Sequence, residues 1–164
     1  MPIEIERKFL VADDGWRSHA DSGRRLIQAY LAQTDRAVVR VRIEDGARAA
    51  MTVKSAAAGL MRQEFEYSIP PAEAEKLAAL RQGAVLEKTR FLVPHAGRRW
   101  EVDVYGGENT GLVLAEIELE SEAAEFDRPA WLGTEVTGDA RYYASRLSRN
   151  PFAAWGRGTS EPSR

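Results

Sequence analysis

The sequence contains no cysteine and only two histidines. The absence of cysteine excludes disulfides, thiolate metal ligands and a cysteine nucleophile. No apolar run approaches the roughly 18 residues that a membrane-spanning helix needs, and the N-terminus has no basic region followed by an apolar stretch. The formal net charge is −2, which gives no overall attraction to nucleic acid or to an anionic membrane. These absences predict a cytoplasmic protein that has neither nucleic acid nor a membrane as a partner.

The composition is typical of a soluble globular protein. Of the 164 residues, 44% are hydrophobic and 29% are charged. This length is sufficient for one domain with a substantial core. We expect a single domain over residues 1–155 and a disordered tail over residues 156–164. The sequence leaves the oligomeric state open, with a homodimer as one option.

The stretch from Pro2 to Val11 alternates between apolar and charged side chains. Because side chains of a strand point to opposite faces with a period of two, the stretch is predicted to be a strand with one charged face. The apolar face carries Ile3, Ile5 and Phe9, and the charged face carries Glu4, Glu6 and Lys8. A strand that faces solvent would also alternate, so this strand alone does not decide the fold.

The same alternation returns in nearly every later strand candidate. These candidates are residues 25–33, 36–44, 48–54, 62–69, 84–93, 98–105 and 112–120. Asp45-Gly46 predicts a hairpin turn, since glycine readily takes the positive φ of tight turns, and the short connections favour antiparallel pairing. Other segments are expected to be helical or loop-like, namely a short helix around 16–20, helices over 72–82, 121–132 and 139–154, and a small-residue loop over 55–60 that serves as a flexible flap.

About eight alternating strands allow two architectures. In a plain sheet, the apolar face is covered by helices and the charged face meets water. In a closed barrel, the charged faces line the interior and helices cover the apolar outer face. Closure also removes the unpaired edges that invite aggregation. The number of charged side chains in register favours the closed barrel.

The charged faces of these strands carry acids and bases at alternate positions. The carboxylates are Glu4, Glu6, Glu64, Glu66, Glu101, Asp103, Glu116 and Glu118, and the bases are Lys8, Arg40, Arg42, Arg48, Lys54, Arg62, Lys88 and Arg90. Like charges at alternate positions of one strand point the same way and repel one another unless something neutralises them. Cross-strand ion pairs on a solvated sheet would explain single pairs, but exposed pairs contribute little stability. They do not explain so many paired motifs in one domain.

A metal-complexed polyphosphate would neutralise both signs of charge. Oxygen ligands without cysteine favour a hard ion, Mg²⁺ or Mn²⁺, at the glutamate pairs. Guanidinium groups bind phosphate oxygens in a bidentate manner. The pattern therefore indicates a site for a triphosphate compound and a divalent metal.

The ordered series of these motifs resembles the CYTH domain, the family of triphosphate tunnel metalloenzymes. Its first member is similar to the E-x-E-x-K signature of that family. The series consists of Glu4-Ile5-Glu6-Arg7-Lys8, Arg40-Val41-Arg42, Thr52-Val53-Lys54, Arg62-Gln63-Glu64-Phe65-Glu66, Lys88-Thr89-Arg90, Glu101-Val102-Asp103, Ala115-Glu116-Ile117-Glu118-Leu119 and Glu135-Val136-Thr137. The resemblance covers residues 2–150. It implies an α+β fold, in which an eight-stranded antiparallel closed barrel forms a triphosphate tunnel with flanking helices.

The resemblance also implies roles for individual side chains. The metal would be held by carboxylates, drawn from Glu4, Glu6, Glu64, Glu66, Asp103, Glu116 and Glu118. The triphosphate would be held by basic side chains, namely Lys8, Arg40, Arg42, Lys54, Arg62, Lys88 and Arg90. The residues expected to act in catalysis are Glu4, Glu6, Lys8 and Glu118. Tyr30 shares the charged face of its strand, where it is either a substrate contact or a buried structural tyrosine.

The activity that the resemblance implies is hydrolysis of inorganic tripolyphosphate to pyrophosphate and phosphate, as in the short bacterial branch of the family. The alternatives within the same fold are an adenylate cyclase and a hydrolase of thiamine triphosphate or nucleoside triphosphates. A non-catalytic polyphosphate-binding module is an alternative of another class. The two glutamate pairs argue against that module, because anion binding alone would be better served without them.

Overall fold

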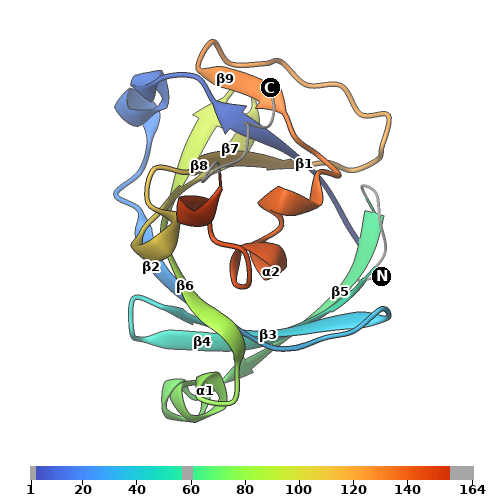
Figure 1. Ribbon diagram of the computed structural model, residues 1–164. Coiled ribbons are helices and arrows are strands. Elements are labelled where there is room, and N and C mark those ends of the chain that lie inside the picture. Colours follow the sequence, from blue (N-terminus) through green and yellow to red (C-terminus); the bar gives the residue numbers. More distant parts are fainter. Residues whose placement is uncertain (1–2, 57–60, 156–164) are drawn as a thin grey trace.

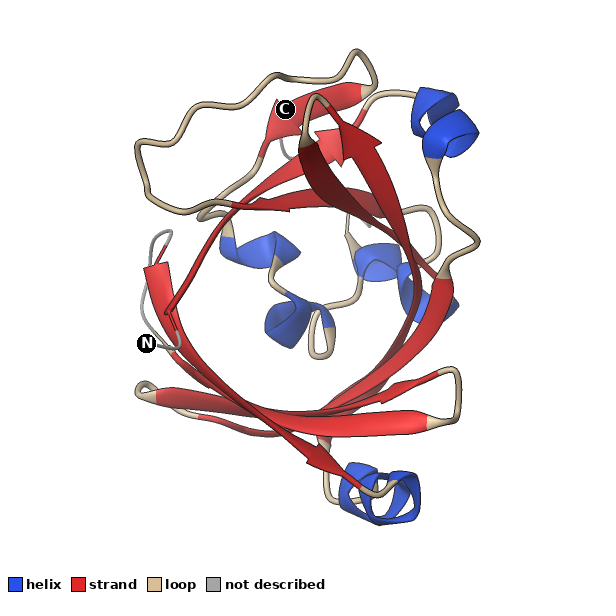
Figure 2. Ribbon diagram, turned by 180° about the vertical axis from the view of Figure 1, so that it is seen from behind, coloured by secondary structure: helices blue, strands red, loops and turns tan. Residues whose placement is uncertain are grey.

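The computed structural model describes residues 3–56 and 61–155. The described residues form nine strands, eight of which close into an antiparallel barrel (Figures 1 and 2). The strands are β1 (Ile3–Val11), β2 (Arg24–Gln33), β3 (Ala37–Glu44), β4 (Arg48–Ser55), β5 (Met61–Ile69), β6 (Gln82–His95), β7 (Arg98–Tyr105), β8 (Val113–Glu118) and β9 (Leu132–Glu135). The predicted closed barrel is confirmed. Pro2, residues 57–60 of the expected flap and the expected tail over 156–164 lie outside the described residues.

Strand β1 closes the barrel. Around the ring the order is β5, β4, β3, β2, β6, β7, β8 and β1. Residues 6–10 of β1 pair with β8, and residues 3–5 pair with β5. The short strand β9 pairs with the end of β1, from Phe9 to Val11. The sequence did not predict β9 as a strand.

The register places charged side chains on the inner face of the barrel. Directly opposed residues of an antiparallel pair project from the same face. Lys8 of β1 lies opposite Glu116 of β8, and Glu116 in turn lies opposite Glu101 of β7. The plain sheet with a solvated charged face is therefore not the fold of this chain.

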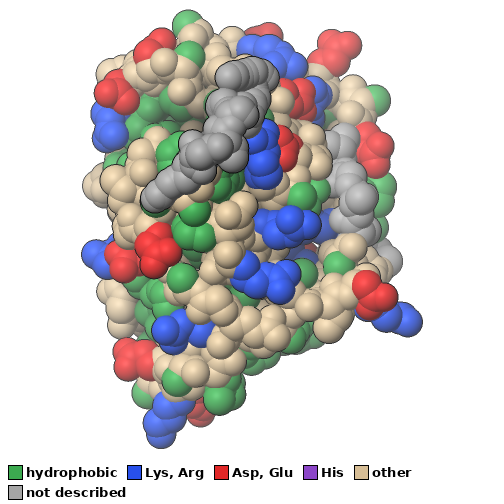
Figure 3. All heavy atoms as spheres, in the orientation of Figure 1, with side chains coloured by type: hydrophobic (Ala, Val, Ile, Leu, Met, Phe, Trp, Pro, Cys, Tyr) green, Lys and Arg blue, Asp and Glu red, His purple; other side chains and the backbone are tan. Residues whose placement is uncertain are grey.

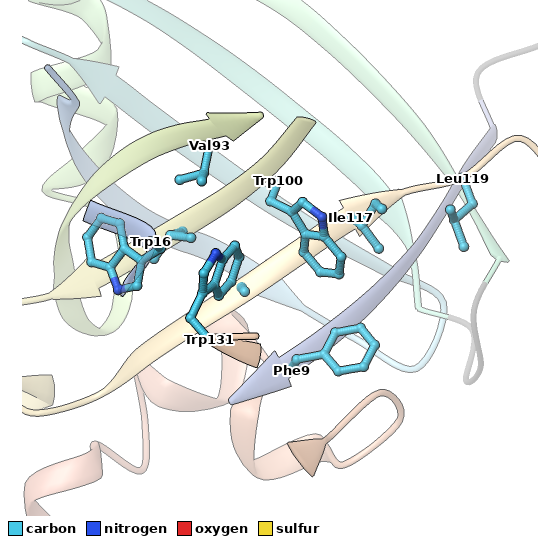
Figure 4. Close-up of a cluster of buried hydrophobic side chains, with 9 residues drawn as sticks. Phe9, Trp16, Val93, Trp100, Ile117, Leu119 and Trp131 are labelled. Carbon is cyan, nitrogen blue, oxygen red and sulfur yellow. The ribbon is translucent and has the colours of Figure 1, made fainter. Parts of the chain in front are cut away.

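An apolar cluster covers the outer face of β1, β6, β7 and β8 (Figure 4). Its buried members are Phe9, Trp16, Val93, Trp100, Val102, Ala115, Ile117, Leu119 and Trp131. Trp16 comes from the 3-10 helix η1 (Asp14–His19), and Trp131 comes from the loop that precedes β9. The Phe126 ring of the same loop meets Phe9 edge-on at a centroid distance of 6.1 Å. A loop and a single 3-10 helix thus cover this face; the short helix expected around residues 16–20 is present, whereas the helix expected over 121–132 is not.

A second apolar cluster lies where the C-terminal segment, residues 136–155, folds across one mouth of the barrel (Figure 1). The segment contains the short helices η3 (Ala140–Tyr142), α2 (Ala144–Leu147) and η4 (Phe152–Ala154). The backbone N–H of Ala84 donates to the Ser148 carbonyl at 2.8 Å. A Cβ at Gly83, whose φ is +75°, would lie 2.6 Å from the same carbonyl oxygen. Glycine is therefore required where the segment meets β6.

Helix α1 (Pro71–Ala78) packs on the outside of β2, β3 and β4. The prediction of a helix over 72–82 was right in place and too long. Residues 79 and 80 form a turn, and strand pairing begins at Gln82, opposite Tyr30. Leu80, expected on the apolar stripe of the helix, is 68% exposed.

Two other helix predictions were wrong. Residues 121–131 form a loop and Leu132 begins β9, because Phe126 and Trp131 pack in the apolar cluster of the outer face and Pro129 lacks the N–H that a helix interior needs. Residues 139–154 break into the three short helices of the C-terminal segment, since the chain must turn to cross the mouth and Pro151 interrupts it. In the two described ranges, no helix is long and apolar enough to cross a membrane.

Candidate active site

The barrel encloses a cavity of about 260 Å³ that is lined by side chains from all eight of its strands. Every predicted site residue except Asp103 lines it. These residues are Glu4, Glu6, Lys8, Arg40, Arg42, Lys54, Arg62, Glu64, Glu66, Lys88, Arg90, Glu116 and Glu118. The outer surface in Figure 3 carries acidic and basic side chains interspersed. Alternation placed these residues on the charged faces of their strands, and the resemblance to the CYTH domain selected them as site residues.

Sequence reasoning missed some of the lining residues. The sequence placed Glu101 on a charged face and Thr52 in the motif series, but it assigned neither residue to the site, and both line the cavity. Tyr30, left open between two roles, also lines the cavity. Tyr143 and Ser145 belong to the C-terminal segment, and no sequence pattern placed them at the barrel mouth.

Asp103 lies behind the cavity wall and holds two cations. Its Oδ2 is 2.7 Å from Lys88 Nζ, and the Arg90 guanidinium donates to both of its carboxylate oxygens at 2.8 and 2.9 Å. Burial alone would raise the pKa of this carboxyl, but the Arg90 and Lys88 charges hold it well below its usual range. Both carboxylate oxygens of Asp103 therefore already accept hydrogen bonds or ion pairs from cations of the protein.

Lys88 and Arg90 depend on Asp103 to different extents. Burial lowers the pKa of Lys88 to about 8, although the nearby Asp103 charge opposes the shift. The Asp103 carboxylate contacts both cations, and it accepts two hydrogen bonds from Arg90. Arg90 also lies 3.2 Å from Glu101, and its pKa is raised well above the ordinary value despite burial. Arg90 is therefore a permanent cation, whereas Lys88 titrates near physiological pH.

Lys8 joins the first strand to the C-terminal segment. Its Nζ lies 3.2 Å from Glu116 Oε2 and donates to the Tyr142 carbonyl at 3.2 Å. The Tyr143 ring lies between two cations, with Lys8 Nζ at 5.8 Å and Arg62 Cζ at 5.7 Å from its centroid. Burial would raise the pKa of Glu116, but Lys8 and Arg90 lower it to about 2.

Glu4 and Glu6 carry charges that the protein balances unequally. Burial raises the pKa of Glu6 well above its ordinary value, and the Glu116 and Glu4 charges add to the rise. Burial would also raise the pKa of Glu4, but Lys54, at 3.2 Å, lowers it overall. The Glu6 carboxylate is therefore the most strongly destabilised member of this group when it is ionised.

The inner face of β3 carries the two arginines of the Arg40-Val41-Arg42 motif. Arg40 donates to Thr52 Oγ1 at 3.1 Å, while its Nε is buried without a hydrogen-bond partner. Arg42 donates to Glu66 at 2.9 Å. Burial lowers the pKa of Arg42, and the charges of Arg40 and Arg90 lower it further. An anion bound between these guanidinium groups would relieve their mutual repulsion.

The carboxylates of β1 and β8 fit a hard divalent cation by their chemistry. Glu4, Glu6, Glu116 and Glu118 supply only oxygen donors, which Mg²⁺ and Mn²⁺ prefer. Glu4 Oε1 is buried, and its cationic neighbour is Lys54 Nζ at 3.2 Å. In residues 3–56 and 61–155, no three His, Cys, Asp or Glu side chains are already grouped as metal ligands. Metal binding would therefore require Glu4 and Glu116 to turn from their lysine partners.

Comparisons with known proteins agree with this geometry. The family model for the CYTH domain matches residues 2–144. An inorganic triphosphatase from Acetivibrio thermocellus is 45% identical over 153 residues, which cover 93% of this chain and 97% of that protein. An inorganic triphosphatase from Nitrosomonas europaea is 43% identical over 152 residues, which cover 88% of this chain and 96% of that protein.

A solved structure has the same fold. The crystal structure of the inorganic triphosphatase NE1496 superposes with a TM-score of 0.64 at 38% sequence identity. The match covers 88% of this chain and 96% of that chain. The likeness thus extends over the barrel that encloses the cavity.

Proposed function

The chain belongs to the CYTH domain family, and on that premise we propose that it is a metal-dependent inorganic triphosphatase, which hydrolyses tripolyphosphate to pyrophosphate and phosphate. The observation that carries the proposal is the cavity, where lysine and arginine side chains face the glutamates of β1 and β8. The names of the two relatives, at 45% and 43% identity, support the same activity.

The basic side chains of the cavity are suited to hold the triphosphate. Arg40 and Arg42 face it from β3, and Lys88 and Arg90 face it from β6. Guanidinium groups bind phosphate oxygens in bidentate pairs, and lysines add mobile point charges. A bound phosphate would also neutralise these cations in place of the carboxylates with which they are now paired.

The divalent ion, Mg²⁺ or Mn²⁺, would be held by Glu4, Glu6, Glu116 and Glu118, the carboxylates that also line the cavity. When bound, it would neutralise phosphoryl oxygens and lower the pKa of a coordinated water. Lys8, paired with Glu116, lies where the carboxylate and phosphate-binding groups meet. It would therefore contact both the metal ligands and the substrate.

Hydrolysis consumes one water at one terminal phosphorus. The water oxygen bonds to that phosphorus, the bridging P–O bond breaks, and pyrophosphate leaves with the bridging oxygen. The two protons of the water pass to the phosphate products or to solvent. Because negative charge develops on the leaving oxygen, fixed arginines beside it stabilise the transition state. The cations that Asp103 holds in place, Lys88 and Arg90, are suited to this task.

Product analysis tests the proposal. Purified protein is given tripolyphosphate, ATP or thiamine triphosphate, each with Mg²⁺ or Mn²⁺ and each with a chelator. We expect metal-dependent release of phosphate and pyrophosphate from tripolyphosphate and little product from ATP. Cyclic AMP from ATP would instead identify a cyclase, and faster turnover of thiamine triphosphate would identify a different hydrolase. Tight tripolyphosphate binding without product would identify a binding module.

A further inference from the structure

Gln28 is a buried amide without hydrogen bonds. Gln28 is only 1% exposed, and both its Nε2 and its Oε1 lack a hydrogen-bond partner in the protein. Among the residues that the structure describes, no other side chain has both of its polar atoms buried and unpartnered. Native proteins satisfy nearly all such atoms, so an exception requires an explanation.

The register places Gln28 on the inner face of the barrel among phosphate-binding cations. It lies directly opposite Arg42 of β3, which lines the cavity. Arg40 and Lys88, which line the cavity as well, are its diagonal neighbours on β3 and β6. Opposed residues have Cβ atoms about 5 Å apart, and long side chains reach the diagonal positions. Gln28 therefore shares the inner face with these cations, although it does not itself line the cavity, and Leu86 of β6 lies opposite it on the other side.

The cations around Gln28 are bonded to other residues, so none of them donates a hydrogen bond to its amide. Arg42 donates to Glu66, Arg40 donates to Thr52, and Lys88 lies against Asp103. Arg40 Nε, on the adjacent strand, is likewise buried without a partner. The inner face of β2 and β3 thus contains donors and an acceptor that nothing in the protein satisfies. A ligand with several anionic oxygens would satisfy the donors.

We propose that Gln28 is a further substrate-binding residue, whose Nε2 donates to a phosphoryl oxygen of bound tripolyphosphate. Its Oε1 accepts from the Arg42 guanidinium when that group turns from Glu66 toward the phosphate. The amide then has partners for both atoms, and it contributes a hydrogen bond without adding charge to the wall. The inference rests on the proposed function, because it assigns a contact to the substrate of that same cavity.

The test replaces the amide by an apolar side chain of similar length, Gln28→Met. Replacing a buried polar group that has no hydrogen bond by an apolar group of similar shape does not lower the free energy of unfolding. We therefore expect the melting temperature of the unliganded variant to be equal to or above that of the wild type. The KM for tripolyphosphate should rise about tenfold while kcat changes less than twofold, as expected when a binding contact is lost. A KM within twofold of the wild-type value would overturn the proposal.

A charged variant and a matched control complete the experiment. Gln28→Glu keeps the shape but places a carboxylate beside the phosphate, so KM should rise further than in Gln28→Met; a smaller rise would contradict the contact. Gln33→Met removes another amide of β2 whose nitrogen is buried and unpartnered, and it should leave KM within twofold of the wild-type value. A fall in melting temperature with unchanged KM in Gln28→Met would mean that the amide holds internal water only, which would also overturn the proposal.

Binding without turnover separates this inference from the proposed function. In chelator, tripolyphosphate should raise the melting temperature of the wild type more than that of Gln28→Met. If the wild type binds but does not hydrolyse tripolyphosphate, the proposed activity fails while the Gln28 contact stands. If both proteins respond equally to tripolyphosphate, the Gln28 contact fails whatever the activity.

Discussion

Cations of the cavity are already paired with carboxylates of the protein. Lys54 lies against Glu4, Lys8 against Glu116, and Lys88 against Asp103. In the low-dielectric interior these pairs offset part of the cost of burying charge. A phosphate that enters must therefore displace carboxylates from these lysines. The displaced carboxylates lose their positive partners, and a bound divalent ion would neutralise them instead. Substrate and metal are expected to bind cooperatively for this reason.

Lys88 should give the activity an alkaline limit. Its pKa is about 8, below the ordinary value of 10.5, because burial disfavours the ammonium. As the pH rises through about 8, the free enzyme loses this charge, so kcat/KM for tripolyphosphate should fall about tenfold by roughly pH 9. Steady-state kinetics across this range check the prediction. Lys88→Arg should remove this alkaline fall in kcat/KM, since arginine stays charged. A fall of the same size in that variant would contradict the prediction.

Folding stability should respond to Lys88 in the opposite direction. The folded-state pKa lies below the unfolded-state value, so the unfolded chain binds more protons between about pH 8 and pH 10.5. The contribution of this lysine to stability therefore rises with pH across that window. The loss of activity above pH 8 is then not a consequence of unfolding.

Glu4 should be indispensable for turnover but not for folding. Glu4→Gln removes one charge from the carboxylates that would hold the metal, while the side chain keeps its shape in the wall. We expect at least a hundredfold loss of kcat, with a melting temperature close to that of the wild type. The matched control is Glu87→Gln, which makes the same change on β6, where Glu87 pairs with Arg25. Comparable activity in both variants would show that Glu4 is not part of the metal site.

The C-terminal segment, residues 136–155, closes one mouth of the barrel. Leu147 is fully buried in the second apolar cluster, at the mouth of the barrel. The Asn109 side chain accepts a hydrogen bond from the Phe152 N–H at 2.7 Å. Tyr142 and Phe152 both pack edge-on against Trp155. These contacts fix the position of Tyr143 beside Lys8 and Arg62.

Leu147→Ala should destabilise the whole protein. Deleting a fully buried leucine costs about 2–5 kcal/mol of unfolding free energy, because apolar contact is lost and a cavity remains. Urea unfolding measures the effect. Leu80→Ala, at a position that is 68% exposed, should change the free energy of unfolding by about 0.5 kcal/mol or less. Equal effects of the two substitutions would mean that the segment does not pack against the barrel.

The molecule as a whole confines charge that most proteins leave in water. Glu6, Glu116 and Glu4 repel one another inside the barrel, as do Arg40, Arg42 and Arg90. The apolar clusters on the outer face and at the closed mouth must offset this repulsion. A ligand that binds only the folded state should therefore stabilise the protein strongly.

Tripolyphosphate with Mg²⁺ should raise the melting temperature by roughly 5–10 °C. A ligand at about one hundred times its dissociation constant stabilises by about 2.7 kcal/mol, and each kcal/mol shifts a protein of this size by about 2–4 °C. Metal and tripolyphosphate are mixed immediately before a fast thermal scan, so that turnover is limited. Sodium sulfate at equal ionic strength serves as the control. A shift of the same size with sulfate would indicate general screening of charge.

The sequence by itself determined the barrel and the inner face of each strand. Alternation with a period of two is a local property, so residues such as Glu4, Arg40 and Lys88 could be placed on one surface without knowledge of the fold. The ordered motifs then pointed to the CYTH family. Boundaries were less certain, as α1 shows, because the turn after Ala78 depends on the pairing of Gln82 with Tyr30.

Only the tertiary structure decided how the charges are partnered and what closes the mouth. Asp103 lies on the charged face of its strand, as the other expected metal ligands do on theirs, but both of its oxygens contact Lys88 or Arg90. Residues 121–132 and 139–154 have helical composition, yet packing against aromatic rings and the barrel rim imposes a loop and three short helices. Pairing and packing arise between residues far apart in the chain, so no local pattern records them.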